Sequence, residues 1–143
     1  MKKVLVMHGI NLAMFGKRDP KHYGIETLAV INRRIGELAQ ELEIEVEFFQ
    51  SNSEADFVER IHAAHQSDVT GIVVNAGAWT HYNYAIMDAF AILAIPIVEV
   101  HMSNVHAREE FRHHSVLSKV VKGSIAGFGI DSYLLGVRAL CQE

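Results

Sequence analysis

The sequence predicts an α/β fold in which a five-stranded parallel sheet carries helices on both faces. Five short apolar runs rich in β-branched residues alternate with segments that have the spacing of amphipathic helices. Because each expected strand is followed by a helix, the strands should run parallel, and a parallel sheet is normally covered on both sides. Five such units favour the flavodoxin-like strand order 2-1-3-4-5.

The expected strands are short and end in polar or turn-forming residues. They span residues 4–7, 45–49, 71–74, 97–100 and 120–128, the last being interrupted by Lys122 and Gly123. Runs of this length that are rich in valine and isoleucine are typical of strands buried on both faces.

The expected helices lie between these strands. Thr27 is a suitable N-cap for the first helix, and Ser53 for the second, which has acidic residues in its first turn. The apolar stripe of the first helix consists of Leu28, Ile31, Ile35, Leu38 and Leu42. The third helix spans residues 83–94, and the last runs from about residue 131 to the C-terminus.

The third helix is apolar on nearly all sides, with Asp88 as its exception. A helix on the surface of a monomer should keep a polar face. Burial against another subunit explains this pattern, so we expect a homo-oligomer. The alternative is a central helix that is covered by its own chain.

The composition limits the class of protein. A chain of 143 residues fits one domain, 1–143, and its net charge of −4 offers no basic surface for nucleic acid. The single cysteine, Cys141, is expected to be unreactive and indicates a reducing compartment. No apolar stretch is long enough for a secretion signal or a membrane span. We therefore expect a soluble, cytoplasmic protein that does not bind membranes.

The loops after strands one, three and four hold the unusual chemistry. In an open parallel sheet, ligands bind beyond the carboxyl ends of the strands, where the strand order reverses. The segment 8–26 is the one long irregular stretch, and such loops are usually functional. Asn11 lies in this segment, while Asn75 and His81 follow strand three. We expect these side chains to meet the polar stretch that begins at His101.

Glu99 and His101 should project to the same side of strand four, because side chains alternate along a strand. A carboxylate beside a histidine selects the tautomer of the ring and favours its protonated form, which makes His101 a candidate general acid. A surface ion pair at a strand end is an equally compatible interpretation.

Arg18 and Tyr23 share the long loop, between two glycines that would let it close over a ligand. A phenol acts as a base near neutral pH only when its phenolate is stabilised, and an arginine in contact can do this. The alternative is an exposed arginine beside an aromatic ring that anchors the loop.

Arg108 and Arg112 are four residues apart and would share one face if the segment after Val105 is helical. Their planar forks suit carboxylates and hydroxyl-rich ligands, and backbone N–H groups at Met102-Ser103 could also receive a carboxylate. The residues thus indicate a small site for an anionic, hydroxylated molecule.

Cofactors and metals are not expected. The segment after strand one lacks the phosphate loop of flavin proteins and the Gly-x-Gly-x-x-Gly dinucleotide motif. The histidines at 101, 106, 113 and 114 could be zinc ligands, but no cysteine or His-Glu-x-x-His helix accompanies them. We regard zinc as the weaker interpretation.

Several blocks of the sequence resemble the type II 3-dehydroquinate dehydratase (3-dehydroquinase) family over roughly residues 4–140. These blocks are Gly9-x-Asn11-Leu12, Gly16-x-Arg18-x-Pro20-x-x-Tyr23-Gly24, Gln50-Ser51-Asn52, Asn75-x-Gly77-x-x-Thr80-His81 and the stretch from Glu99 to Arg112. The last block is long and highly specific.

The resemblance implies a cofactor-free hydro-lyase of the shikimate pathway or of quinate catabolism. It would convert 3-dehydroquinate to 3-dehydroshikimate by anti elimination through an enolate, with Tyr23 as base and His101 as acid. The resemblance further implies that Arg18 keeps Tyr23 ionisable, Asn11 holds a water at the enolate oxygen and Glu99 orients His101. For the substrate it implies carboxylate binding by Asn75, Met102 and Ser103, and hydroxyl binding by His81 and Arg112.

The same resemblance implies a dodecamer of four trimers, in which Asp88 reaches a neighbouring subunit's site. Some residues depart from the family's usual pattern: His8 and Ile10 where it has Asn and Pro, Asp19 where it has Glu, and Tyr82 and Asn83 where small hydroxyl residues are common. We expect Ile10 to loosen the backbone at Asn11, and Tyr82 and Asn83 to narrow the rim of the pocket. The departures leave open a paralogue that binds a quinate-like hydroxy acid as a sensor or scaffold, and a dehydratase of a related acid.

Overall fold

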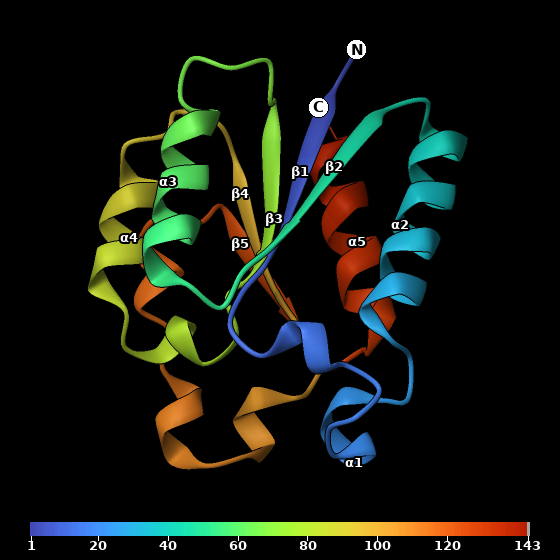
Figure 1. Cartoon of the computed structure of the whole chain (residues 1–143), viewed down its shortest axis with the longest axis vertical. Coiled ribbons are helices and arrows are strands. Elements are labelled where there is room, and N and C mark those ends of the chain that lie inside the picture. The colour runs from blue at the N-terminus through green and yellow to red at the C-terminus, as the bar shows by residue number, and fades with distance from the viewer. Residues whose placement is uncertain (143) are drawn as a thin grey trace.

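The computed structural model describes residues 1–142, which contain one five-stranded sheet in the order β2-β1-β3-β4-β5. The strands are β1 (Lys3–His8), β2 (Glu45–Gln50), β3 (Gly71–Asn75), β4 (Ile97–His101) and β5 (Gly123–Ala126). All neighbouring pairs are parallel. The predicted fold and strand order are therefore confirmed, and all carboxyl ends lie at one edge of the sheet, at the bottom of Figure 1.

Two helices cover each face of the sheet (Figure 1). Helices α2 (Leu28–Leu42) and α5 (Ile130–Leu140) lie on one face, and α3 (Glu54–Ala64) and α4 (Tyr84–Ala91) on the other. The side chains of β1 alternate between them: Val4 and Val6 pack toward α2 and α5, and Leu5 and Met7 toward α3 and α4. The short helix α1 (Pro20–Tyr23) lies at the carboxyl edge.

The expected helix N-caps are confirmed. The Thr27 hydroxyl accepts a hydrogen bond from the backbone N–H of Val30 at 3.3 Å. The Ser53 hydroxyl does the same for Asp56 at 3.2 Å. These bonds satisfy backbone donors that the first turn of a helix leaves free, so the helices begin where the sequence indicates.

Some element boundaries differ from expectation. β5 begins at Gly123, because Val120 and Val121 pack into the core beside α3 and α4 after a 3-10 helix at Val116–Lys119. Helix α4 ends at Ala91, three residues before the expected end. Helix α5 ends at Leu140, and residue 143 at the expected C-terminal end lies outside the described residues.

The segment after Val105 does not form one continuous helix, which was the condition for Arg108 and Arg112 to share a helical face. It folds as two 3-10 helices, Val105–Ala107 and Glu110–His113. Arg108 lies between them with an extended backbone, at φ −111° and ψ −162°. The condition for a shared helical face of Arg108 and Arg112 is therefore not met, although both side chains line the same pocket.

Helix α4 has both a buried and an exposed apolar face. Ile86, Ala89 and Phe90 are buried by the chain itself, whereas Tyr84 is 65% exposed and Ile92, which directly follows the helix, is 54% exposed. The chain alone thus covers only the inner half of this helix. None of the helices within residues 1–142 is long and apolar enough to cross a membrane.

Candidate active site

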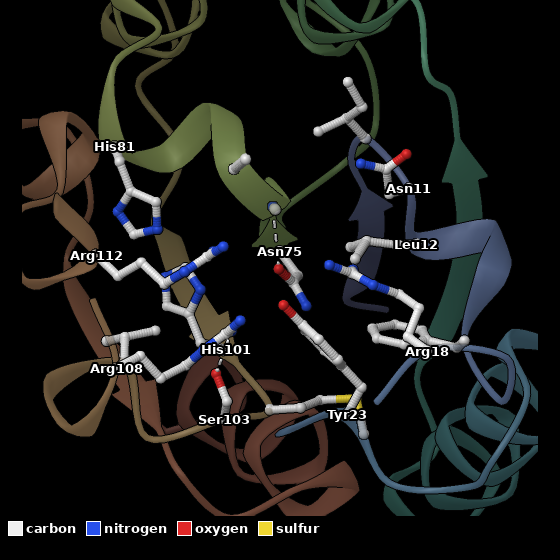
Figure 2. Close-up of a pocket in the computed structure, with 16 residues that line it drawn as sticks. Asn11, Leu12, Arg18, Tyr23, Asn75, His81, His101, Ser103, Arg108 and Arg112 are labelled. Atoms are coloured by element: carbon white, nitrogen blue, oxygen red, sulfur yellow. Dashed lines mark hydrogen bonds between the residues drawn. The ribbon is translucent and has the colours of Figure 1, made fainter. Parts of the chain in front are cut away.

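A pocket of about 130 Å³ lies at the carboxyl edge of the sheet, between the loops that follow β1, β3 and β4 (Figure 2). This volume is below the roughly 300–1,000 Å³ of typical drug-sized sites, so it suits one small ring. The polar side chains that line it are Asn11, Arg18, Tyr23, Asn75, His81, His101, Ser103, Arg108 and Arg112. Met102 also lines it, together with Ile10, Leu12, Phe15, Gly77, Ala78 and Val105.

The loop after β1 is packed tightly against the loop after β3. The Gly9 N–H donates to the backbone oxygen of Asn75 at 2.7 Å. A Cβ at position 9 would lie 2.5 Å from the Ala76 oxygen, so only glycine permits this approach.

The same loop is tied to the last residue of β2 and to a residue just after it. The Gln50 amide donates to the Gly9 oxygen at 3.1 Å, and Asn52 Oδ1 accepts from the Asn11 N–H at 2.9 Å. Asn11 has a left-handed backbone, with φ 70°. These bonds hold Asn11 at the pocket although Ile10 lacks the ring that would restrict φ.

Tyr23 lies between two guanidinium groups. The guanidinium carbon of Arg18 is 3.7 Å from the centroid of the Tyr23 ring, and that of Arg108 is 4.9 Å away. Figure 2 shows the hydroxyl end of Tyr23 pointing into the pocket. Both guanidiniums are thus within the range of a cation–π contact with this ring.

The departure at Asp19 has a local explanation. Its carboxylate accepts from the Lys21 N–H at 3.0 Å and so caps α1, in which Pro20 occupies the first position. Aspartate is among the preferred N-cap residues, and proline is favoured at the start of a helix. The residue therefore helps to shape the turn that carries Tyr23.

The expected pair on β4 is present. His101 Nε2 lies 2.6 Å from Glu99 Oε2, and both side chains are buried. The Ser115 hydroxyl donates to the other carboxylate oxygen of Glu99 at 2.8 Å. Glu99 does not line the pocket itself but lies behind His101. Its carboxylate orients the His101 ring through the hydrogen bond to Nε2.

His81 presents a neutral ring to the pocket. Its Nδ1–H donates to the backbone oxygen of His114 at 2.8 Å. Burial lowers the pKa of His81 below its usual value, which outweighs the bond to His114. Nε2 therefore remains an acceptor for a ligand hydroxyl, and the ring lies parallel to that of His101 at 6.2 Å.

The charge of the pocket differs from that of the whole chain. Three arginines line it, and no aspartate or glutamate does so among the residues described, whereas the net charge of the chain is −4. Arg108 Nη1 donates to the Ser103 hydroxyl at 3.2 Å, and Arg112 Nε contacts Glu109 at 3.0 Å. Guanidinium groups in a partly enclosed pocket of this kind select an anion.

Most of the predicted site residues line this one pocket, and the two that do not are Glu99 and Asp88. Glu99 lies behind the pocket as described, and Asp88 is exposed on α4, outside the pocket of its own chain. The expectation that Tyr82 and Asn83 narrow the rim was wrong. Tyr82 is 58% exposed and Asn83 caps α4 by accepting from the Ile86 N–H at 2.9 Å, so neither side chain lines the pocket.

Sequence reasoning missed residues that support the site from behind. Ser115 was given no role, although it lies in the same polar stretch as His101. Tyr133, on α5, bonds Asn75 and was treated only as part of a helix. Within residues 1–142, no group of three or more His, Cys, Asp or Glu is arranged to hold a metal ion.

Comparisons with known proteins agree on one family. The family model described as dehydroquinase class II matches residues 2–141. The chain is 66% identical over 139 residues to the 3-dehydroquinate dehydratase of Syntrophotalea carbinolica, covering 97% of this chain and 94% of that protein. It is 61% identical over 136 residues to that of Leptothrix cholodnii, covering 95% and 91%. The crystal structure of a type II dehydroquinase from Butyrivibrio crossotus matches with a TM-score of 0.97 and 42% identity, covering 99% and 98%.

Proposed function

The chain belongs to the class II dehydroquinase family, and we propose that it is a hydro-lyase that dehydrates 3-dehydroquinate to 3-dehydroshikimate. The observation that carries this proposal is the pairing, in one anion-selective pocket, of a tyrosine between two guanidiniums with a histidine held by a carboxylate. The first group is suited to accept a proton and the second to donate one.

In the proposed reaction, the Tyr23 phenolate removes the proton alpha to the ketone. The electron pair of that C–H bond moves toward the carbonyl and forms an enolate. Arg18 and Arg108 stabilise the charged base before this step, because both guanidiniums face its ring. Asn11 holds a water that hydrogen-bonds to the enolate oxygen.

In the second step, the enolate collapses and the hydroxyl leaves on the opposite face of the ring. His101 protonates this hydroxyl, which departs as water, and the product is a conjugated enone. Glu99 stabilises the protonated imidazole in the meantime, and Ser115 fixes the carboxylate. Each of the two proton-transfer groups is expected to contribute roughly 10²–10⁴ in rate.

The substrate is held by groups that do not react. Asn75 and the backbone of Met102 and Ser103 receive the carboxylate, while His81 and Arg112 bind ring hydroxyls. His81 suits this role because its neutral Nε2 accepts a hydrogen bond. The carboxylate and hydroxyls together explain why the pocket combines arginines with uncharged polar groups.

The test is an absorbance assay for the conjugated enone after adding 3-dehydroquinate to purified protein. Wild-type protein should generate the signal, and Tyr23→Phe should abolish it while circular dichroism stays unchanged. Tyr82→Phe, which removes an exposed hydroxyl outside the pocket, is the matched control. Full activity in Tyr23→Phe would refute the tyrosyl base.

The alternative, a paralogue that binds a quinate-like acid without turnover, rested on the departures at His8 and Ile10. Asn11 nevertheless lines the pocket, and His8 is buried beneath it. No contact in the pocket favours binding without turnover over catalysis. Ligand-dependent thermal stabilisation with no enone signal would nevertheless support that alternative.

We propose that the chain works as a homo-oligomer, with a trimer-based dodecamer as the assembly that the family resemblance implies. The outer face of α4 supports this proposal, because Tyr84 and Ile92 expose apolar surface on either side of Asp88. In such an assembly Asp88 would reach a neighbour's pocket. Light scattering should give the mass of a dodecamer, and Ile92→Glu should reduce it.

We propose a cytoplasmic enzyme of the shikimate pathway, which leads to aromatic amino acids, or of quinate catabolism. Deletion of the gene should make growth depend on aromatic amino acids if the role is biosynthetic. Failure to grow on quinate alone would instead indicate the catabolic role.

A further inference from the structure

A buried network of hydrogen bonds lies directly beneath the pocket, and the proposed reaction does not explain it. His8 at the end of β1 and Tyr133 on α5 are both 0% exposed. His8 Nδ1 lies 3.0 Å from the Tyr133 hydroxyl, and the Asn75 amide nitrogen lies 3.0 Å from that hydroxyl as well. Neither His8 nor Tyr133 lines the pocket, but Asn75 does.

The direction of every hydrogen bond in this buried network follows from one backbone donor, the N–H of Gly77. The N–H of Gly77 can only donate, and it does so to Asn75 Oδ1 at 3.2 Å. The Asn75 amide must therefore turn its NH₂ toward Tyr133, whose oxygen accepts. The Tyr133 hydroxyl hydrogen is then directed to the remaining partner, His8 Nδ1.

The hydrogen bond at the other end of this network, between His8 and Asn32, agrees with this direction. If His8 Nδ1 accepts, Nε2 must carry the ring proton, and Nε2 lies 2.8 Å from Asn32 Oδ1, an acceptor. Burial lowers the pKa of His8 to about 4 and raises the pKa of Tyr133 above its usual value. Both groups are therefore neutral at pH 7, and the donor and acceptor roles persist.

The consequence for the pocket concerns the second hydrogen of the Asn75 amide. One N–H is bonded to Tyr133, so the other remains available to a ligand. Figure 2 shows the amide end of Asn75 directed into the pocket, with its bond to Gly77 dashed. A reversed amide would present a carbonyl oxygen there instead and would repel a carboxylate.

We infer that Tyr133, backed by His8 and Asn32, is a positioning residue that holds the Asn75 amide with an N–H facing the substrate carboxylate. The identity of that substrate rests on the proposed function. The orientation itself rests on the hydrogen bonds, and it predicts a preference for carboxylate ligands even in the absence of turnover.

The experiment is a double-mutant cycle between Tyr133→Phe and Asn75→Ala. It is read in two ways: kcat and KM with 3-dehydroquinate, and calorimetric Kd for quinate, a stable hydroxy acid. Because the second reading needs no chemistry, failure of the proposed function would show as absent turnover and leave the cycle interpretable. Thermal unfolding of each variant measures any purely structural loss.

Tyr133→Phe should raise KM and the quinate Kd roughly tenfold, the effect of one lost hydrogen bond, with little change in kcat. In the Asn75→Ala background, Tyr133→Phe should alter KM and the quinate Kd by less than about twofold, because Tyr133 acts through Asn75. Equal losses in both backgrounds, or no loss in either, would overturn the inference. Tyr82→Phe is the control for removing a hydroxyl.

A second variant, Asn32→Ala, tests the same inference if Tyr133→Phe fails to fold. Asn32 is half-buried on α2, away from the pocket, and alanine suits a helix. Asn32→Ala frees His8 to adopt the other tautomer, which would reverse the Tyr133 hydroxyl. It should raise KM and Kd roughly threefold with Asn75 present and not in Asn75→Ala, a pattern that a simple loss of stability does not produce. An effect that persists in Asn75→Ala would overturn the inference.

Discussion

Glu99 and His101 approach to 2.6 Å on the same side of β4, and Ser115 holds the free carboxylate oxygen of Glu99 at 2.8 Å. Both carboxylate oxygens are thus engaged, so the orientation of the imidazole is set by a buried carboxylate that cannot easily turn. Replacing that carboxylate with an amide keeps the shape but removes the negative charge that faces the His101 ring.

Glu99→Gln should lower kcat by roughly 10²-fold, the lower end of what a general acid supplies, with KM changing less. Ser115→Ala should have a smaller effect of about tenfold, because it loosens Glu99 without removing it. Ser118→Ala, at an exposed position in the same segment, is the matched control. Steady-state kinetics with the enone assay measure these effects, and an unchanged kcat in Glu99→Gln would contradict the role of the pair.

Removing Arg18 should slow the reaction by withdrawing the nearer of two cations from the Tyr23 ring. Arg18→Ala should reduce kcat by roughly 10²–10³, the effect of losing one preorganised electrostatic contact. Arg18→Lys should recover only part of this loss, since a lysine lacks the planar group that lies over the ring. Lys17→Ala removes an exposed cation from the adjacent position and should behave as wild type in the same assay.

The fold and the two contacts Glu99/His101 and Arg18/Tyr23 were predictable because their signals are local. Strands, N-caps and the Glu99/His101 pair follow from spacing within a few residues, and Arg18 and Tyr23 share one loop. The supporting network carries no such signal. Tyr133 meets Asn75 across 58 positions and His8 across 125, and nothing in the sequence near Tyr133 distinguishes it from a core aromatic.

Arg108 and Arg112 illustrate a different limit. Both side chains line the pocket, but the helix on which their shared face was conditional does not form. The chain forms two short 3-10 helices there instead, and the first begins at a side-chain cap in which Asn104 Oδ1 accepts from the His106 N–H at 3.2 Å. Ser115 went unnoticed for the same reason, since its role exists only once β4 brings Glu99 beside it.

His8 should make stability fall with acid in a defined range of pH. Its folded-state pKa is lowered from 6.5 to about 4, chiefly by burial, so the unfolded chain binds the proton first. Stability is therefore lost as pH falls from about 6.5 toward 4, by about 3 kcal/mol in total for a shift of this size. Urea titrations across this range should show the decrease, and His8→Asn, which cannot titrate, should show a decrease smaller by that amount. An identical pH dependence in both proteins would contradict the assignment of a neutral, buried His8.

Gly77 and Gly36 should respond in opposite directions to the same substitution. Gly77 has φ +62°, and a Cβ there would lie 2.7 Å from the backbone oxygen of Ile10. Gly77→Ala should therefore destabilise the fold by about 1–3 kcal/mol from backbone strain alone. It should also weaken ligand binding, because the Gly77 N–H sets the orientation of the Asn75 amide.

Gly36 lies inside α2 with nothing within 4 Å of an added Cβ, so Gly36→Ala should stabilise the protein by about 0.5–1 kcal/mol. Urea denaturation of the two variants measures both changes, and a destabilised Gly36→Ala would show that the space beside α2 is filled in solution.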